Sequence, residues 1–469
     1  MSFIRIWFGL SFLIPLCAMG FNHGHFYHQR SILMQSGSVE GQHLKLRSDG
    51  SLRDAEVSFY NQTLDHSDKN SPTFKQRYFI DSRYAGSPQS PVFYIICGEW
   101  NCAGTGSYSF VENLAKKKKA HLVALEHRFY GESLPTKKLT STALKHLHLQ
   151  AAIDDLASFQ TYITNERGFK GKWVAFGGSY AGTLAAFYRE KHPELVVGAL
   201  ASSAPVFMKN EFSEYDAHVA KVINKTNCGA KVRKAVQLIE EKISSPEGAI
   251  EVKKIFKASA LTNNVDFLYV VADMLAAAVQ YGHDQSFCET LNKGRNPIED
   301  YARAGLSVLS AMGTTPFDIS LAVAVKEDVT AEDNMRQWMW QSCREFGWFQ
   351  VANGQGANSS RSSQIDLPYH EGVCKRLFTK EMGKDGALNN QWFYPLFQPV
   401  TSDILFTNGS NDPWLNLSVV SGQANGQHGL DLLMMEGAAH CNDLRLATNF
   451  PSVLAAHAKI QLIIEDWIK

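Results

Sequence analysis

Short, continuously apolar runs alternate with longer helical patterns between about residues 90 and 205, and this alternation strongly limits the folds open to the chain. The apolar runs are PVFYIICG (91–98), HLVALEHR (121–128), KWVAF (172–176) and LVVGALASSAPV (195–206). Strands that are apolar along their whole length and joined by helices form a parallel sheet with both faces covered. The sequence therefore predicts an α/β fold with a mostly parallel sheet between layers of helices.

The alternation stops after this region and resumes near the C-terminus. Residues 207–390 have mainly helical patterns and no clear strand, whereas SDILFTNG (402–409) and LDLLMMEG (430–437) again have the pattern of buried strands. The simplest interpretation is one α/β core, formed by residues 21–206 and 391–469, with a helical cap inserted between its two parts. Two independent domains are the alternative, but they would leave the late strands without a sheet.

The N-terminus has the parts of a secretory signal peptide. Arg5 precedes the apolar run IWFGLSFLIPLCAMG (6–20), and small residues near the end of this run fit cleavage before Phe21. An N-terminal membrane anchor is the alternative, but the run is shorter than the roughly 20 residues that a span needs. We therefore expect residues 1–20 to be a signal peptide and the mature protein to have no membrane anchor.

The cysteine content also suits the secretory pathway. Of the eight cysteines, Cys17 leaves with the signal peptide, so seven remain and at least one has no partner within the chain. Five N-x-Ser/Thr sequons are candidate glycosylation sites: Asn61, Asn224, Asn358, Asn408 and Asn416. We expect a secreted or lysosomal protein, since the sequence does not separate these two destinations.

The charges are balanced, with 46 basic and 46 acidic residues. No overall field therefore favours nucleic acid or an anionic membrane as a partner. The sequence also has no HExxH motif, no Walker A motif and no cysteine pair at zinc spacing. We therefore expect neither a metal nor a cofactor.

The stretch FGGSYAG (176–182) has the form of a nucleophile elbow. An apolar strand precedes Ser179, a helical pattern follows it, and small residues flank it, as the crowded strand-to-helix turn requires. Gly177 stands two positions before the serine, but Ala181 replaces the glycine usual two positions after it. Ser179 is the candidate nucleophile, and a polar residue in an ordinary tight turn is the alternative.

A serine nucleophile needs a base and an acid that orients the base. In α/β-hydrolases these follow in the order serine, acid, histidine. Asp412 follows the strand at 402–409, and His440 follows the last strand, so both lie where the carboxyl ends of parallel strands place functional groups. Asp403 and Asp443 are weaker candidates for the acid.

An oxyanion hole needs two backbone N–H donors. The residue after the nucleophile, Tyr180, is the first candidate, and Gly98 in the stretch CGEW (97–100) after an earlier strand is the second. A glycine there would let the backbone approach the substrate closely. A plain turn is the alternative interpretation of CGEW.

Together these residues resemble the serine peptidase family of lysosomal prolyl carboxypeptidase, dipeptidyl peptidase II and thymus-specific serine protease, with details closest to the thymus-specific branch. The similarity covers nearly the whole mature chain. It is carried by NQTLDHSDKNSPTFKQRYFI (61–80), LEHRFYGESLP (125–135), the region around Ser179, QWMWQSCREFGWFQ (337–350), NGSNDPW and AHCNDL. The resemblance implies an α/β-hydrolase core with a helical cap, and the roles of nucleophile, acid and base for Ser179, Asp412 and His440.

The resemblance also implies further site residues. Trp414, in the DPW motif, would form a wall of a proline pocket, with a core tryptophan as the alternative. Within the cap, the expected disulfides are Cys343 with Cys374 and Cys228 with Cys288, although spacing alone does not fix the connectivity.

The chain departs from its relatives in the oxyanion loop. Relatives commonly have GGEG where this chain has CGEW, so Cys97 and Trp100 change this loop. Cys102 and Cys441 would flank the site and are a candidate pair. Gly178 stands where another family of serine carboxypeptidases has a glutamate that helps to hold the substrate carboxylate, so that mode of recognition is not expected.

The expected function is hydrolysis of short peptides near one terminus, after proline, by a Ser–His–Asp acyl-enzyme mechanism. The expected partners are peptide substrates, and a homodimer is one option for the oligomeric state. The alternatives are a secreted lipase or esterase on the same fold, and a hydrolase-like binding protein that has lost turnover.

Overall fold

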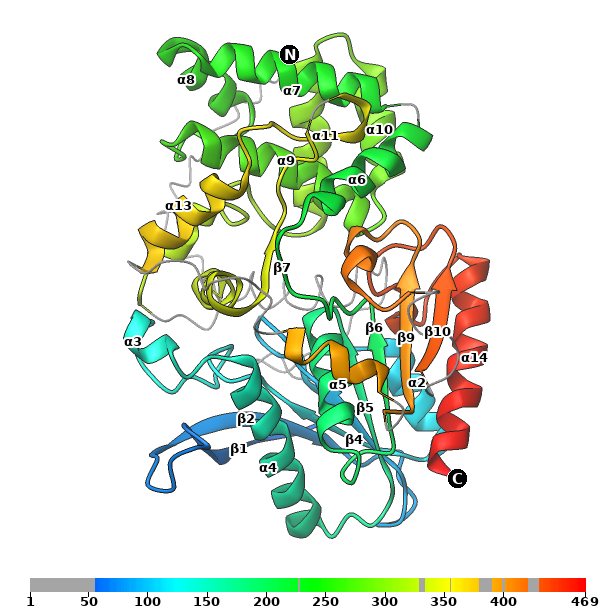
Figure 1. Ribbon diagram of the computed structural model, residues 1–469. Coiled ribbons are helices and arrows are strands. Elements are labelled where there is room, and N and C mark those ends of the chain that lie inside the picture. Colours follow the sequence, from blue (N-terminus) through cyan, green and yellow to red (C-terminus); the bar gives the residue numbers. More distant parts are fainter. Residues whose placement is uncertain are drawn as a thin grey trace, which may run out of the picture.

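The computed structural model describes residues 55–469 except 227, 329–333, 355, 379–389, 399–400 and 421–429. The predicted signal peptide at residues 1–20 lies outside the described residues. Figure 1 shows a sheet flanked by helices in the lower part of the molecule, with a group of helices above it.

The central sheet has eight strands in the order β1-β2-β4-β3-β5-β6-β9-β10. Strands β1 and β2 pair antiparallel, as do β2 and β4, and the other neighbours are parallel. This confirms the predicted α/β-hydrolase fold. The strands are β1 (Glu56–Thr63), β2 (Thr73–Asp81), β3 (Val92–Ile96), β4 (His121–Leu125), β5 (Trp173–Gly178), β6 (Gly198–Ser202), β9 (Ile404–Gly409) and β10 (Leu430–Met435).

The antiparallel strands β1 and β2 were not among the predicted strands. β1 lies at the edge of the sheet and mixes exposed, half-buried and buried positions, so it has none of the continuous apolar character of the central strands. The predicted run 195–206 is also longer than the observed strand, because only Gly198–Ser202 pairs with its neighbours.

Helices cover both faces of the sheet. Side chains of β3 alternate between the two faces, so that Val92, Tyr94 and Ile96 lie in one apolar cluster, and Phe93 and Ile95 in another. The first cluster contains α4 (Leu149–Arg167) and α5 (Tyr180–Lys191), and the second contains α2 (Ser109–Lys118) and α14 (Pro451–Ile468). A short helix, α3 (Ser141–Leu144), precedes α4.

The chain between β6 and β9 is mostly helical and forms the upper part of Figure 1. Its helices are α6 (Ser213–Lys225), α7 (Gly229–Ile243), α8 (Pro246–Ile255), α9 (Asn264–Gln280), α10 (Asp284–Lys293), α11 (Pro297–Ala311), α12 (Met335–Gln341) and α13 (Leu367–Phe378). We call this segment the cap. The expectation of no strand here was wrong, since β7 (Lys209–Glu211) and β8 (Gly347–Phe349) form a short parallel pair. Three residues are too few for an apolar run to reveal such a strand.

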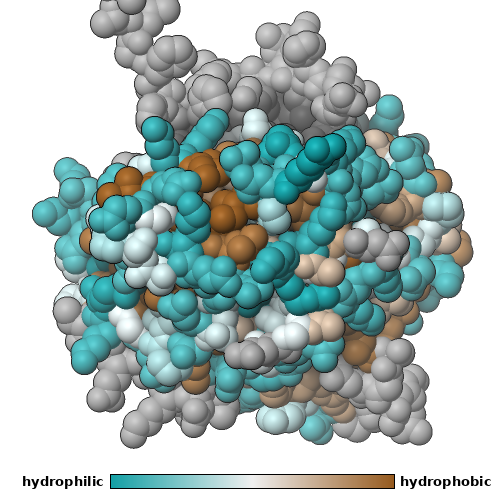
Figure 2. Space-filling view, turned by 90° about the horizontal axis from the view of Figure 1, so that it is seen from above, coloured by the Kyte–Doolittle hydropathy of each residue, from teal (hydrophilic) through white to brown (hydrophobic). Residues whose placement is uncertain are grey.

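The cap buries its apolar residues inward. Helix α9 is the most apolar helix of the cap, and eleven of its residues are buried. Viewed from above, the outer face is mainly hydrophilic, with hydrophobic residues gathered in small patches (Figure 2). Among the described helices, none is both long enough and apolar enough to cross a membrane.

Three disulfides occur among the described residues: Cys97–Cys102, Cys228–Cys288 and Cys343–Cys374. The last two are those that the resemblance implied. The candidate pair Cys102 with Cys441 was wrong, because Cys97 and Cys102 close one short loop with their Cα atoms 5.7 Å apart, within the usual range for a disulfide. Cys441 is left as a free thiol.

The sequons differ in exposure. Asn61, Asn224, Asn358 and Asn416 are exposed, whereas Asn408 is buried in β9 and donates its side-chain amide to the Val419 carbonyl at 3.1 Å. A glycan on Asn408 is incompatible with this packing, so its candidacy as a glycosylation site was wrong. The Asn-Gly-Ser sequence at this position belongs to a buried strand of the sheet and the turn after it, and it matches the sequon by chance.

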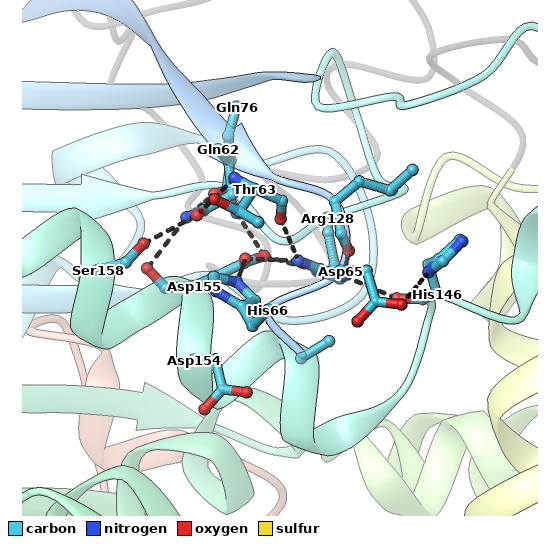
Figure 3. Close-up of polar contacts among 12 residues, drawn as sticks. Gln62, Thr63, Asp65, His66, Gln76, Arg128, His146, Asp154, Asp155 and Ser158 are labelled. Carbon is cyan, nitrogen blue, oxygen red and sulfur yellow. Dashed lines mark hydrogen bonds and ion pairs between the residues drawn. The ribbon is translucent and has the colours of Figure 1, made fainter. Parts of the chain in front are cut away.

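A buried ion pair ties the N-terminal strands to the core (Figure 3). The Arg128 guanidinium, which has no solvent exposure, donates two hydrogen bonds to the Asp155 carboxylate of α4, at 2.7 and 2.6 Å. It also donates to the carbonyls of Thr63, Leu64 and His146. Because Asp155 additionally contacts His66 and Gln76, one carboxylate joins three separate segments of the chain.

Substitution of Arg128 by Met should lower the free energy of unfolding by about 3–5 kcal/mol, because it leaves the Asp155 carboxylate buried without its charged partner. Chemical denaturation monitored by tryptophan fluorescence would measure this change. Asp154→Asn on the same helix is the matched control and should change stability by less than about 0.5 kcal/mol. An Arg128→Met protein as stable as the wild type would contradict the role given to this pair.

Candidate active site

Ser179 lies at the turn from β5 into α5 in a strained conformation. Its φ and ψ are 57° and −130°, outside the regions that L-residues normally occupy. A Cβ on Gly177 would lie 2.0 Å from the Ala181 carbonyl oxygen, and one on Gly182 would lie 2.9 Å from the Ser202 carbonyl oxygen. The glycines are therefore required by crowding, and the strained serine between them has the geometry of a nucleophile elbow.

Asp412 and His440 meet beyond the carboxyl ends of β9 and β10. His440 Nδ1 lies 2.7 Å from Asp412 Oδ2, and the other carboxylate oxygen accepts a hydrogen bond from the Trp414 backbone N–H at 3.0 Å. Both side chains are buried. The backbone N–H of His440 donates to the carbonyl of Gln280 at the end of α9, so the cap helps to position the backbone of this residue.

Two neighbours act on the protonation of His440. Burial by itself disfavours the imidazolium, but the Asp412 carboxylate, together with Cys441, outweighs burial and raises the pKa of His440 well above its usual value. An imidazole held by a carboxylate in this way can accept a proton from a hydroxyl and stay oriented while it is charged.

The two weaker candidates for the acid have other partners. Asp403 lies before β9, at the opposite end of that strand from Asp412, and forms an ion pair with Arg189 at 3.0 Å. Asp443 is buried and accepts hydrogen bonds from the hydroxyls of Ser202 and Thr407. Among the three carboxylates, only Asp412 contacts the His440 side chain.

Ser179 and His440 line the same cleft, which contains about 530 Å³ of space not filled by atoms. Gly98 lies on its wall against the first turn of α5, where a Cβ would come within 3.0 Å of the Ala181 nitrogen. The backbone of Gly98 and the N-terminus of α5, which begins at Tyr180, therefore border one space together with Ser179. The ten lining residues are Gly98, Glu99, Trp100, Tyr108, Gly178, Ser179, Ala181, Tyr281, His440 and Cys441.

The loop that carries Gly98 is closed on itself. The Cys97–Cys102 disulfide encloses Gly98, Glu99 and Trp100, all of which line the cleft. Trp100 has a φ of 83°, a value that favours glycine, so the bulky residue of CGEW occupies a backbone position suited to the glycine of GGEG. The disulfide thus restrains a loop that contains a strained residue.

Trp414 belongs to an aromatic cluster beside the site. It is 8% exposed, packs against Phe212, Tyr215 and Trp348, and donates its indole N–H to the Gln280 side-chain oxygen at 2.9 Å. It is not among the ten residues that line the cleft. Its role as a wall of a proline pocket stays a prediction.

Several residues of the site were not predicted. The Tyr180 hydroxyl contacts His127 Nε2 at 3.0 Å and accepts a hydrogen bond from Gln341 of the cap at 2.8 Å. The Tyr108 hydroxyl accepts from the Gly178 N–H, and Tyr281 reaches the cleft from the end of α9. Glu99 and Trp100 belong to the stretch CGEW that the sequence analysis singled out. The cap residues Tyr281 and Gln341 had no local signal of a role in the site, because only the fold brings them close to Ser179.

No group of three or more His, Cys, Asp or Glu side chains in the described part of the chain could hold a metal ion. The site itself consists of the Ser179 hydroxyl and the His440 imidazole on one cleft, with the Asp412 carboxylate bonded to the imidazole.

Comparison with known proteins assigns the chain. The family model for serine carboxypeptidase S28 matches residues 62–460, which span the whole of this site. The chain belongs to the serine carboxypeptidase S28 family. It is 33% identical over 413 residues to a probable serine protease, EDA2, of Arabidopsis thaliana, with 84% of this chain and 82% of that protein covered.

Two animal proteins are also similar. The thymus-specific serine protease of Mus musculus is 29% identical, with 85% of this chain and 84% of that protein covered. The lysosomal Pro-X carboxypeptidase of Bos taurus is 26% identical, with coverage of 80% and 82%. This S28 chain is accordingly a serine peptidase, and its three disulfides are typical of the secretory pathway.

Loss of the Cys97–Cys102 disulfide in this S28 peptidase should slow labelling of Ser179 by a fluorophosphonate about tenfold, because Gly98 would be held less firmly beside the serine. The measurement is the labelling rate of Cys97→Ala/Cys102→Ala protein. Loss of Cys228–Cys288 in the cap is the matched control.

The control should cost more stability, about 4 kcal/mol against about 2 kcal/mol, because it opens a loop of 60 residues of separation instead of 5. It should nevertheless label at the wild-type rate. If the variant without Cys228–Cys288 labelled more slowly than the variant without Cys97–Cys102, labelling would follow the loss of stability. That result would contradict a local role for Cys97–Cys102.

Proposed function

We propose that this protein hydrolyses short peptides near one terminus, after proline, with Ser179 as nucleophile, His440 as base and Asp412 as the acid that orients it. The 2.7 Å contact of buried Asp412 Oδ2 with Nδ1 of His440, which lines the same cleft as Ser179, is the observation that carries the proposal. The strained backbone of Ser179 supports it further.

In the proposed reaction, Ser179 Oγ attacks the carbonyl carbon of the scissile bond while His440 Nε2 takes the hydroxyl proton. The oxyanion accepts hydrogen bonds from the backbone N–H groups of Tyr180 and Gly98. Collapse of this intermediate breaks the C–N bond, and His440 gives its proton to the leaving amine. Water then attacks the acyl-enzyme by the same route and releases the second product.

The cap supports cleavage near a terminus. It contributes Tyr281 to the cleft, its Gln280 carbonyl accepts the backbone N–H of His440, and its Gln341 side chain donates to the Tyr180 hydroxyl. A covered cleft admits a narrow chain more readily than a folded protein surface.

The preference for proline rests on the bovine relative, whose name describes a Pro-X carboxypeptidase. Trp414 is the proposed wall of the proline pocket.

Destination and glycosylation belong to the same proposal. We infer secretion or lysosomal delivery, with glycans on the exposed residues Asn61, Asn224, Asn358 and Asn416.

Mass spectrometry of a peptide library after incubation with the purified protein tests the proposed specificity. The expected products end in proline at the new carboxyl terminus and arise from cuts within a few residues of one end. Cleavage in the middle of long peptides, or indifference to proline, would overturn the specificity. Faster turnover of p-nitrophenyl fatty esters than of any peptide would favour a lipase or esterase instead.

Substitution of Ser179 by Ala should abolish covalent labelling by a fluorophosphonate probe, because Ser179 is the one serine or threonine among the residues that line the cleft. Intact-protein mass spectrometry would show one adduct on the wild type and none on the variant. Ser310→Ala, at an exposed position of α11, is the control and should label fully. An adduct on the Ser179→Ala protein would refute the assignment.

Substitution of Asp412 by Asn should lower kcat/KM by roughly 10³–10⁴-fold, as loss of the orienting acid does in such relays. The base works only when it is neutral, so activity falls as the pH drops through the pKa of His440. Since Asp412 raises this pKa, its removal should also move the acid limb of the pH profile to lower pH.

Asp403→Asn is the matched control for this profile, because Asp403 was the rival candidate and asparagine tolerates its φ of 59°. Its acid limb should coincide with that of the wild type. An unmoved acid limb in Asp412→Asn would contradict the assignment of the acid.

A further inference from the structure

Tyr108 brings a buried hydroxyl to the wall of the cleft, and the mechanism proposed above makes no use of it. The side chain is 5% exposed, and its oxygen accepts a hydrogen bond from the Gly178 N–H at 3.1 Å. Within the part of the chain that the structure describes, the hydroxyl itself donates to no protein acceptor. Burial raises the pKa of Tyr108, so the group stays protonated and is a hydrogen-bond donor at the cleft.

The position of this hydroxyl is fixed by its surroundings. Tyr108 immediately precedes α2, and its ring belongs to the apolar cluster that includes Leu444. The hydroxyl of the next residue, Ser109, accepts a hydrogen bond from the backbone N–H of Leu446 at 2.9 Å. Both leucines lie a few residues after His440, so the start of α2 is attached to the segment that carries the base.

The space beside Ser179 has two different sides. On one side, a Cβ on Gly98 would lie 3.0 Å from the Ala181 nitrogen, so Gly98 borders the first turn of α5, where the proposed oxyanion donors are. On the other side, a Cβ on Gly178 would lie 3.7 Å from the Tyr108 hydroxyl. The Tyr108 hydroxyl therefore lies beside the residue that precedes Ser179, and the oxyanion donors lie beside the residues that follow it.

The side of Gly178 is also the side of the base. A Cβ on Gly178 would lie 3.1 Å from Cys441 Sγ, and Cys441 is the residue next to His440. In the proposed reaction His440 gives its proton to the leaving nitrogen, so the leaving group must lie on this side of Ser179. In a peptide the leaving nitrogen is followed by one Cα and then by a carbonyl group, which is a hydrogen-bond acceptor close to the bond that breaks.

We propose that the Tyr108 hydroxyl donates a hydrogen bond to the first carbonyl oxygen of the leaving group, so that the enzyme favours leaving groups that contain this carbonyl. The inference rests on the proposed peptidase function and specifies the chemical class of the leaving group, an amino acid or peptide in contrast to a simple amine or alcohol. The carbonyl can belong to an amide or to a carboxylate, since both accept a hydrogen bond. Tyr108 is then a specificity-determining residue beside Ser179.

Three substrates that share the acyl group Ala-Pro test the inference: Ala-Pro-Phe-amide, Ala-Pro-Phe and Ala-Pro-phenethylamide. The third carries hydrogen where the first has its carboxamide and the second its carboxylate. Chromatography of the products gives kcat/KM for hydrolysis after proline, and the faster of the two peptides is compared with the phenethylamide. We expect the peptide to exceed the phenethylamide at least about threefold, as one net hydrogen bond gives.

Tyr108→Phe keeps the ring but removes the hydroxyl, so the ratio of the two kcat/KM values should fall by about threefold or more. Fluorophosphonate labelling, which involves no peptide leaving group, reports separately any change that loss of the Gly178 contact causes at the elbow. Tyr84→Phe is the matched control, because the Tyr84 hydroxyl donates to Glu112 of the same helix α2 at 2.9 Å and does not line the cleft. Its ratio should equal that of the wild type.

A kcat/KM for the phenethylamide that equals or exceeds that of the faster peptide in the wild type would overturn the inference, and this result needs no variant. A Tyr108→Phe protein that hydrolyses the peptide and the phenethylamide more slowly by the same factor would also refute it, because the hydroxyl would then only hold the elbow. Both results would leave the Ser179 mechanism intact, since covalent labelling tests it. No hydrolysis of any of the three substrates would instead overturn the proposed peptidase function and, with it, this inference.

Discussion

The parallel pairing of β3, β5, β9 and β10 with their neighbours determines where the reactive groups of this chain can meet. Parallel strands direct their carboxyl ends to one edge of the sheet. Gly98 follows β3, Ser179 follows β5, Asp412 follows β9 and His440 follows β10. Residues separated by more than 300 positions thus converge without any long loop reaching across the molecule. The buried Arg128–Asp155 pair then anchors the antiparallel strands at the other side of the same sheet.

The cap is part of the site as well as its cover. Gln280 accepts the His440 N–H through its backbone carbonyl, and its side-chain oxygen accepts hydrogen bonds from Tyr215 and Trp414. Gln341 similarly connects the hydroxyls of Tyr130 and Tyr180, the latter next to Ser179. The arrangement of Ser179 and His440 therefore depends on two cap residues, Gln280 and Gln341, that are distant in sequence from the strands that carry the site.

The sequence alone was sufficient to predict those parts of the structure that have a recognisable local sequence pattern. The central strands, the elbow at Ser179 and the order of Asp412 and His440 each depend on a short stretch with its own periodicity or on position after a strand. The edge strand β1, its neighbour β2 and the three-residue pair β7–β8 have no such apolar run, so they could not be found in this way.

Contacts made across the fold were beyond prediction for a different reason. The pairing of Cys97 with Cys102 instead of Cys441 depends on how one loop closes. The burial of Asn408 and the surroundings of Glu99 depend on which helices pack over the sheet. Periodicity carries no information on any of these, because each depends on particular side-chain contacts and not on the spacing of apolar residues.

The three hydrogen bonds of Gln280 have a mechanical consequence. Movement of α9 away from the core would break the contacts that hold His440 and Trp414, and would disable the relay at the moment the cleft widened. The cap and the core are therefore mechanically coupled at Gln280, so that the positions of the His440 backbone and of the Trp414 indole depend on the position of α9.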